Sequence, residues 1–299
     1  MWNRVADAYL NMRDRFRLLL DKYWLSRVIH MPEVLSVDDT LETIERERCS
    51  VSRFGDGEIK LLAGESLDFQ PFSEELKGRL HEVLTRPVPG HMVCLPDIFG
   101  DLSAYSPGAQ GHWRGHLAKY RRAWRRNIAD DSRVYGNAFI SRCYMMYGDR
   151  SRTGQWFDGL KLLWRNEDIL LVEGEKSRLG MGNDLFEGAA SVRRILAPNR
   201  DAFACYAALK ESVRSLATPG SLVLLALGPT ATIMAYDLAS EGYRALDIGH
   251  VDIEYEWYRT GTENVSPVRY KYVNEAGGAP QEDRTDESYD RQVVCRILT

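Results

Sequence analysis

The sequence predicts an α/β protein built on a doubly wound, mostly parallel Rossmann-like sheet. Three observations support this fold class. Strand-like and helix-like segments alternate from residue 36 onward, which is typical of a parallel sheet flanked by helices. Residues 221–249 form a complete strand–helix–strand unit. The chain has 299 residues, 44% hydrophobic and 27% charged, so it can bury a large core without disulfides or a structural metal.

The elements of the first half are predicted from caps and apolar spacing. Ser36 and Asp39 resemble a capping box, which predicts a helix from residue 36 to about residue 48. A glycine-, serine- and proline-rich loop is expected to extend to Gly111. We expect further helices from residue 58, over 73–84 and over the very basic stretch 113–128, and strands over 49–54, 91–95 and 135–141.

The second half alternates more regularly. Its most apolar run, 222–227, has the length of a buried strand. We expect strands over 168–173, 222–227 and 245–248, and helices near 155–165, 183–192, 203–217 and 230–240. The stretch 250–257 is compatible with either an extended segment or a helix. These elements complete the predicted doubly wound sheet.

The two ends are separated from the main domain in this prediction. We divide the chain into an N-terminal amphipathic helical extension (1–35), a main domain (36–273) and a C-terminal tail (274–299). Apolar residues recur at helical spacing over 4–29, among more basic than acidic side chains. Such a helix usually packs on its own domain. Peripheral contact with an anionic membrane, or self-association through 4–29, are the alternatives.

Charge and cysteine content indicate the compartment and the class of partner. A formal net charge of −4 gives no overall basic field for nonspecific nucleic-acid binding. The five cysteines are scattered and include no C-x-x-C pair, as expected in a reducing compartment. Charged side chains interrupt the first thirty residues, which argues against a signal peptide. We therefore expect a cytoplasmic protein, at most associated with the inner face of the membrane.

A pair of carboxylates follows the short strand predicted over 49–54. In open α/β sheets, ligands bind beyond the carboxyl ends of the strands. Asp56 and Glu58 lie there, beside Gly55 and Gly57. Their hard oxygen atoms suit Mg²⁺ or Mn²⁺, which in turn binds a nucleotide diphosphate. The alternative is an ordinary turn in which Asp56 caps the next helix.

Two glycine-containing loops could hold an anion or a nucleotide. The loop 173–184 combines glycines with cationic side chains ahead of an expected helix, although it matches neither a Walker A loop nor G-x-G-x-x-G. Its candidate donor-binding residues are Glu173, Lys176, Arg178, Gly182, Asn183 and Asp184. Gly228 and Thr230 follow the most apolar strand and begin the next helix. A solvated surface loop and a plain strand-to-helix turn are the respective alternatives.

A histidine and several acids follow the strand at 245–248. His250, Asp252 and Glu254 are the candidates for a general base or an additional metal ligand. Nearby carboxylates are expected to raise the pKa of His250 above the model value of about 6.5. A purely structural hydrogen bond is the alternative. His112 and His116 are spaced as two metal ligands on one helix face would be, but the sequence offers no third ligand. We therefore assign no metal to this pair.

Taken together, these loops resemble the bacterial GT-D fold glycosyltransferases, first catalogued as a bacterial domain of unknown function. The resemblance extends over about 36–273. The matching segments are RFGDGE (53–58), PDIFGDLS (96–103), YGNAFISR (135–142), EGEKSRLGMGNDLF (173–186), ALGPTAT (226–232) and DIGHVDIEYEW (247–257). Departures are small: Cys143 and Met181 stand where proline and valine are expected.

This resemblance implies a metal-dependent transfer of a hexose from a UDP-sugar, of the UDP-glucose or UDP-galactose type. The acceptor would be a glycan or lipid-linked glycan hydroxyl in cell-surface polysaccharide or glycoprotein synthesis. Asp56 and Glu58 would hold Mn²⁺ or Mg²⁺. Arg53, Lys176 and Arg178 would add positive charge near the leaving group. The alternatives are a metal-dependent hydrolase of nucleotide sugars or phosphoesters, and a non-catalytic nucleotide-sugar-binding assembly protein.

Overall fold

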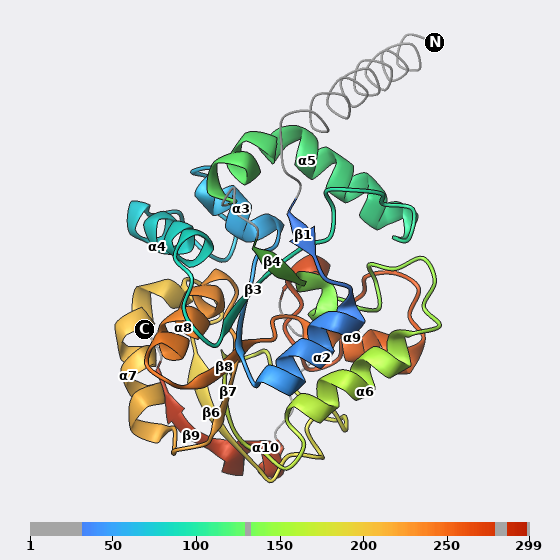
Figure 1. Cartoon of the computed structure of the whole chain (residues 1–299). Helices are drawn as coiled ribbons and strands as arrows, with labels where there is room; N and C mark the ends of the chain where they lie inside the picture. The colour runs from blue at the N-terminus through green and yellow to red at the C-terminus, as the bar shows by residue number, and fades with distance from the viewer. Residues whose placement is uncertain (1–31, 129–132, 279–285, 298–299) are drawn as a thin grey trace.

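The computed structural model describes residues 32–128, 133–278 and 286–297. The helix expected over 4–29 lies outside these ranges. The described residues form a nine-stranded sheet with the order β1-β4-β3-β2-β8-β7-β5-β6-β9, in which every pair of neighbours is parallel (Figure 1). The strands are β1 (Glu33–Val34), β2 (Ser50–Arg53), β3 (His91–Leu95), β4 (Val134–Asn137), β5 (Asp168–Gly174), β6 (Ser191–Ala197), β7 (Leu222–Ala226), β8 (Arg244–Asp247) and β9 (Val293–Arg296). The predicted fold class is confirmed.

Helices cover both faces of this sheet. They are α2 (Val37–Glu47), α3 (Asp56–Leu62), α4 (Glu74–Thr85), α5 (Pro107–Asn127), α6 (Thr153–Leu163), α7 (Tyr206–Leu216), α8 (Pro229–Ser240), α9 (Val251–Thr260) and α10 (Glu287–Gln292). In Figure 1, α2, α6 and α9 lie on one side of the sheet, and α7 and α8 lie on the other. None of the helices in the described ranges combines the length and hydrophobicity that a membrane span needs.

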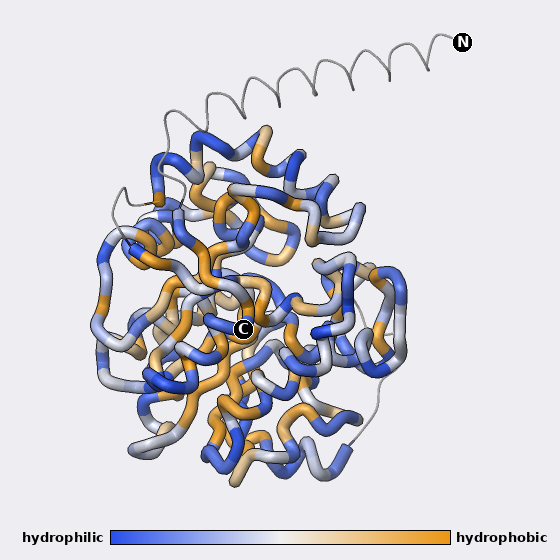
Figure 2. The backbone as a smooth tube through the Cα atoms, turned by 45° about the vertical axis from the view of Figure 1, so that its right-hand side comes forward, coloured by the Kyte–Doolittle hydropathy of each residue, from blue (hydrophilic) through white to orange (hydrophobic). Residues whose placement is uncertain are grey.

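Successive side chains of the central strand β5 point alternately to the two helical layers. Ile169 and Leu171 of β5 pack with α2, α6 and α9 in one apolar cluster. Leu170 and Val172 point to the opposite face and pack with α7 and α8. All four side chains are at most 1% exposed, because a parallel sheet covered on both faces buries its strands entirely. Figure 2 shows hydrophobic backbone crossing the middle of the molecule and hydrophilic turns outside it.

The order of the strands creates a crevice between β2 and β8. The chain leaves β2 into α3, which packs in an apolar cluster with α4, α5 and α8. It leaves β8 into α9, which packs on the opposite face of the sheet. Adjacent parallel strands whose connections diverge in this way form a topological switch point, the usual ligand site of an open α/β sheet.

One helix of the sequence analysis is wrong, and three strands were missed. Residues 183–192 form no helix, because the chain turns repeatedly over 175–190 and then enters β6 at Ser191. Just before the predicted helix, Gly180 and Gly182 have φ angles of +75° and +79°, so the chain turns at the point where the helix was expected to begin. Strands β1, β6 and β9 were not anticipated. Two of them lie inside the segments 1–35 and 274–299, which we had separated from the main domain.

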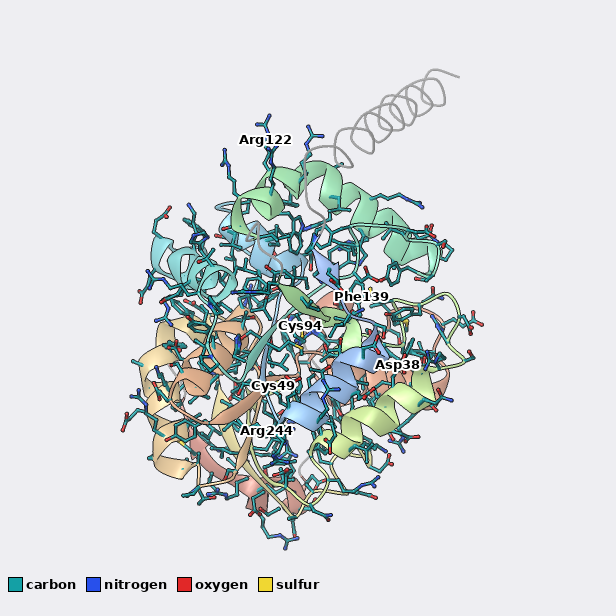
Figure 3. All side chains as sticks on the ribbon, in the orientation of Figure 1. Asp38, Cys49, Cys94, Arg122, Phe139 and Arg244 are labelled. Atoms are coloured by element: carbon teal, nitrogen blue, oxygen red, sulfur yellow. The ribbon has the colours of Figure 1, made fainter. Side chains whose placement is uncertain are left out.

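Helix α5 begins earlier than expected. Ser106 accepts a hydrogen bond from the Ala109 amide and Pro107 occupies the first turn, so the helix starts inside the predicted loop. Its buried residues recur every three or four positions: Ala109, Trp113, His116, Tyr120 and Trp124. The arginines occupy the opposite side, and Figure 3 shows Arg122 pointing away from the body of the protein. His116 is buried and accepts a hydrogen bond from the Trp124 indole, so its role in the described structure is packing.

Candidate active site

A cavity of about 470 Å³ lies at the carboxyl end of the sheet, at the switch point between β2 and β8. This volume falls within the range of about 300–1,000 Å³ that is typical of small-molecule sites. Its walls come from the segments that follow β2 to β8, from α5 and from the region around Glu275. Of the predicted site residues, those that line it are Arg53, Gly55, Asp56, Glu58, Gly228, His250 and Asp252.

Arg53 fastens three elements together at the cavity floor. Its Nε donates to the Asp247 carbonyl oxygen and its Nη2 to Asp247 Oδ1, both at 2.7 Å. Its Nη1 donates to Ser141 Oγ at 2.5 Å. All three guanidinium nitrogens are therefore engaged by the protein itself. A Cβ on Gly249, whose φ is +44°, would lie 1.9 Å from Arg53 Nη2, so this position needs glycine. Arg53 thus supports the loop that carries His250.

The carboxylate pair lies in the first turn of α3. Asp56 Oδ2 accepts from Lys60 Nζ at 2.7 Å and lies 3.7 Å from His112 Nε2. Burial opposes ionisation of Asp56, but Lys60 outweighs it and lowers the pKa. Glu58 Oε2 accepts from the Gly55 amide at 2.7 Å, closing the turn, and burial raises the pKa of Glu58 to about 7. Both carboxylates face the same cavity.

These two carboxylates fit a divalent cation that is shared with a substrate. The described residues contain no group of three or more His, Cys, Asp and Glu side chains arranged to hold a metal ion. A cation such as Mg²⁺ is commonly held by one or two carboxylates together with substrate phosphates, and needs no complete protein cage. Asp56, with a 36% exposed side chain at the cavity, can provide one such ligand. Glu58 can provide the second.

His250 is the last residue before α9 and lines the cavity. Burial, followed by the positive charge of Arg142, lowers its pKa to about 4. Our expectation of a raised pKa is therefore wrong. The nearby carboxylates of Glu275 and Asp56 favour the charged imidazole, but burial and the two arginines beside it outweigh them. A neutral imidazole at pH 7 can accept a proton.

Asp252 and Glu254 are held by other parts of the fold. The Asp252 carboxylate accepts from Lys271 Nζ at 2.7 Å, and from the Gly180 amide and Asn183 Nδ2 at 2.8 Å. Glu254 is completely buried and does not line the cavity within the described structure. Its Oε2 accepts from two backbone amides, and burial raises its pKa to about 7. Both side chains therefore fasten α9 to the loops around the site.

The candidate residues of the loop 173–184 are not among the described residues that line the cavity. Glu173 is fully buried and binds Arg194, Tyr289 and the Leu179 amide. Asp184 accepts hydrogen bonds from Lys161 and Tyr255. The hydrogen bond from Lys161 is the main reason that the pKa of Asp184 is lowered to about 2. The remaining positions bind other parts of the fold: Lys176 and Arg178 contact loops at Asn199 and Tyr270. Gly182 and Asn183 contact helix α9. The loop contributes Gly174, Ser177 and Leu179 to the cavity instead.

Gly228 begins α8 and lines the cavity beside Phe69. Its φ is +56°, and a Cβ there would lie 2.9 Å from the Phe69 ring. Thr230 is fully buried within the first turn of α8, with no hydrogen-bond partner for its hydroxyl among the described residues. The neighbouring Thr232 instead donates to the Arg53 carbonyl at 2.9 Å. Only Gly228 of this predicted pair faces the cavity.

Several residues at the cavity were not among the predicted candidates. They are Asp247, Arg142, Glu275, His112 and Asn199. Asp247 ends β8, so the rule that placed Asp56 at a strand end could have identified it. Arg142 follows the short 3-10 turn η1 (Ala138–Ser141) after β4. Glu275 is distant from every predicted strand, and no sequence signal connects it to the site.

Comparisons with known proteins agree with this architecture. The profile of a family described as "Glycosyltransferase GT-D fold" matches residues 51–276. A "Probable glycosyl transferase Gly" of Streptococcus gordonii is 41% identical over 271 residues, covering 88% of this chain and 39% of the relative. "Glycosyltransferase GlyD" of Streptococcus pneumoniae serotype 4 is 37% identical over 282 residues, covering 94% of this chain and 34% of the relative. This chain thus spans well under half the length of either relative.

Solved structures show the same similarity over nearly the whole described fold. One described as "A New Glycosyltransferase (DUF1792) from Streptococcus sanguinis" has a TM-score of 0.85 and 41% identity, covering 90% of this chain and 100% of its own. Another is described as showing that "the highly conserved domain of unknown function 1792 has a distinct glycosyltransferase fold". It has a TM-score of 0.85 and 38% identity, with coverage of 89% and 96%.

Proposed function

This chain belongs to the GT-D glycosyltransferase family, and from that premise we propose that it transfers a hexose from a UDP-sugar to a glycan hydroxyl. The observation that carries the proposal is the cavity at the switch point. It brings the Asp56–Glu58 carboxylate pair, the neutral His250 and the start of α8 into one space. A diphosphate-linked donor needs a cation site, and an acceptor hydroxyl needs a base.

Asp56 and Glu58 would hold Mn²⁺ or Mg²⁺ together with the donor diphosphate. When bound, such an ion stabilises the negative charge that develops on departing UDP. Gly228, the residue before α8, would let the backbone come close to the ribose or phosphate, because it has no side chain and lines the cavity. Arg53 acts through position, because its hydrogen bonds to Asp247 and Ser141 support the cavity floor.

His250 is the base that we favour among the three candidates. Its pKa of about 4 leaves the imidazole neutral at pH 7, and it lines the cavity. Asp252 already accepts hydrogen bonds from Lys271, Asn183 and a backbone amide. Glu254 is completely buried. His250 would take the proton of the acceptor hydroxyl as that oxygen attacks the anomeric carbon and the bond to UDP breaks.

The hexose and its acceptor are proposed from the family resemblance. A UDP-glucose or UDP-galactose donor fits this premise, as does an acceptor glycan, free or lipid-linked, of a bacterial surface polysaccharide or glycoprotein. Such a reaction would take place in the cytoplasm or at the inner face of the membrane. The names of the relatives specify glycosyl transfer without a donor or an acceptor.

Product analysis tests the proposal directly. Purified protein is incubated with Mn²⁺ and radiolabelled UDP-glucose or UDP-galactose, with and without a panel of oligosaccharide acceptors. A transferase places label on an acceptor and releases little free hexose without one. Release of free hexose at the same rate without acceptor would instead show a hydrolase. Binding of UDP-sugars without any turnover across the panel would indicate an assembly protein.

A further inference from the structure

Arg142 and Glu275 form an ion pair inside the cavity. Arg142 follows η1, and Glu275 lies in the short turn η3 (Asn274–Ala276), 133 residues further along the chain. The Arg142 Nη2 donates a short hydrogen bond to Glu275 Oε1. Both side chains line the cavity and remain partly exposed, at 24% for Arg142 and 33% for Glu275. The pair therefore adjoins the space that a ligand would fill.

Arg142 is the cation of this cavity that a ligand can reach. Arg53 and Arg142 are the arginines among the described lining residues, and no lysine lines the cavity there. All three nitrogens of the Arg53 guanidinium already donate to Asp247 and Ser141. The Arg142 guanidinium has one hydrogen bond in the described structure, to Glu275. Its Nη1 lies 4.0 Å from Glu254 Oε1, an atom that has no hydrogen-bond partner among the described residues.

Glu275 is an anion in a position where an anionic ligand would compete with it. Burial opposes its ionisation, but the charge of Arg142 outweighs that effect and lowers the pKa of Glu275 to about 2. The negative charge of Asp56 acts in the opposite direction and disfavours the charged form of Glu275. Two backbone hydrogen bonds join Val273 to Gly278 and close the turn that carries Glu275, so this turn is anchored at both sides. A carboxylate and a phosphate offer a guanidinium the same kind of oxygen acceptors.

We propose that Arg142 binds the diphosphate of the donor, and that Glu275 occupies the same guanidinium until the donor displaces it. The identity of the anion as a nucleoside diphosphate rests on the proposed function. Displacement leaves Arg142 paired with phosphate oxygens, next to the carboxylates that we assign to the cation. Glu275 is then a competing counter-ion, and its removal favours binding of the donor.

The two residues are predicted to have opposite effects on affinity for UDP. Isothermal titration calorimetry with UDP and Mn²⁺ should show Kd rising roughly tenfold or more in Arg142→Gln, because a charged hydrogen bond is lost. In Glu275→Gln, Kd should fall roughly threefold or more, because a competing charge is removed. In the double variant, Glu275→Gln should bring no such gain. Glu263→Gln, an exposed carboxylate of the preceding loop, is the matched control and should bind as wild type does.

Loss of fold is separated from loss of binding by two further measurements. Arg142→Lys keeps a positive charge near the buried Glu254, and thermal unfolding is recorded for every variant. Uridine, which carries no phosphate, should bind all variants alike. Weaker or unchanged UDP binding in Glu275→Gln overturns the proposal, as does unchanged binding in a folded Arg142→Gln. Unchanged UDP binding with a raised KM for the acceptor would assign Arg142 to an acceptor anion and equally overturn it.

Pyrophosphate distinguishes this inference from the proposed function. In one outcome, the wild-type protein binds pyrophosphate but not UDP, and the Kd for pyrophosphate rises in Arg142→Gln and falls in Glu275→Gln. This outcome supports the anion site and contradicts the UDP-sugar donor. If UDP binds tightly in a metal-dependent way and neither residue affects it, the donor is supported and the assignment of Arg142 is overturned.

Discussion

At the scale of single residues, the account depends on how few side chains support the cavity floor. Arg53 joins the ends of β2 and β8 to η1, and it can do so only because Gly249 has no side chain. Asp247 receives two of these hydrogen bonds and is 3% exposed. A small change at Gly249 should therefore displace His250 and Arg53 together.

Gly249→Ala tests this arrangement. The alanine Cβ would lie 1.9 Å from Arg53 Nη2 at a φ of +44°, so the arginine must move. We expect turnover to fall by roughly 10²-fold, the effect of a misplacement of about 1 Å. Gly242→Ala is the matched control: its φ is +86°, but nothing lies within 4 Å of the added Cβ. It should cost about 1–2 kcal/mol of stability and leave turnover unchanged. Equal losses of turnover in both variants would contradict the role of Arg53.

The second residue-scale prediction concerns the protonation of His250. An NMR titration, with the His250 resonance assigned by its absence in His250→Gln, should give a pKa near 4. In the unfolded chain, the pKa of His250 is about 6.5. Between pH 6.5 and 4, the unfolded chain therefore binds this proton more readily than the folded protein does. Stability should accordingly fall as the pH decreases through that window, and should fall less in His250→Gln. A titration midpoint above 6.5 would show that the neighbouring carboxylates outweigh burial.

The sequence was informative where a residue directly follows a strand. Asp56, Glu58, Gly228 and His250 lie at the cavity because parallel strands bring their carboxyl ends together. Glu254 follows His250 by four residues, which is the spacing of neighbours on one face of a helix. In helix α9, however, the Glu254 side chain is buried in the interior. Side-chain partners distant in sequence, such as Lys271 for Asp252, cannot be read from local spacing.

At the scale of elements, a buried network fastens the loop 175–190 to α9. Lys271 is 2% exposed and donates to Asp252 at 2.7 Å and to Glu256 at 3.0 Å. Asn183 donates to the same two carboxylates. The loop that we expected to hold a ligand is thus held by the helix that follows β8. Its contacts place Leu179 and Ser177 at the cavity wall.

Lys271→Met should be strongly destabilising. It leaves the Asp252 carboxylate, which is 1% exposed, without its counter-charge, and breaking a buried pair typically costs about 3–5 kcal/mol. Urea unfolding measures the loss. Lys176→Met replaces an exposed lysine of the loop 175–190 that lies outside this network, and should change stability by less than about 0.5 kcal/mol. A loss in Lys271→Met no larger than in that control would contradict the structural role of the network.

Elements with strong periodicity were predictable and those without it were not. Strand β3 has the predicted bounds, and α2 begins at the predicted cap, because Ser36 accepts from the Asp39 amide. Strand β6 carries two adjacent arginines and was missed, since Arg194 is buried through contacts distant in sequence, with Glu173 and Gln292. Strand β9 is short and joins the sheet only through tertiary pairing with β6. Local sequence does not contain that information.

At the scale of the whole molecule, the fold places one cavity where connections diverge to opposite faces of the sheet. The predicted fold class and the predicted family are confirmed by this topology and by the similarity to GT-D glycosyltransferases. The donor, the cation and the acceptor are proposals that rest on the contents of that cavity. Together they form the central claim, that a UDP-sugar binds there through a cation held by Asp56 and Glu58.

Calorimetric titration of UDP-glucose or UDP-galactose, with and without Mn²⁺, tests that claim most directly. The wild-type protein should bind at least one of these donors in a Mn²⁺-dependent way. Asp56→Asn should lose that dependence with its fold intact, because one anionic ligand is removed at a partly exposed position. Asp68→Asn, an exposed aspartate that does not line the cavity, should bind as wild type does. Equal donor affinity with and without Mn²⁺, or unchanged Mn²⁺-dependent binding in Asp56→Asn, would contradict the account.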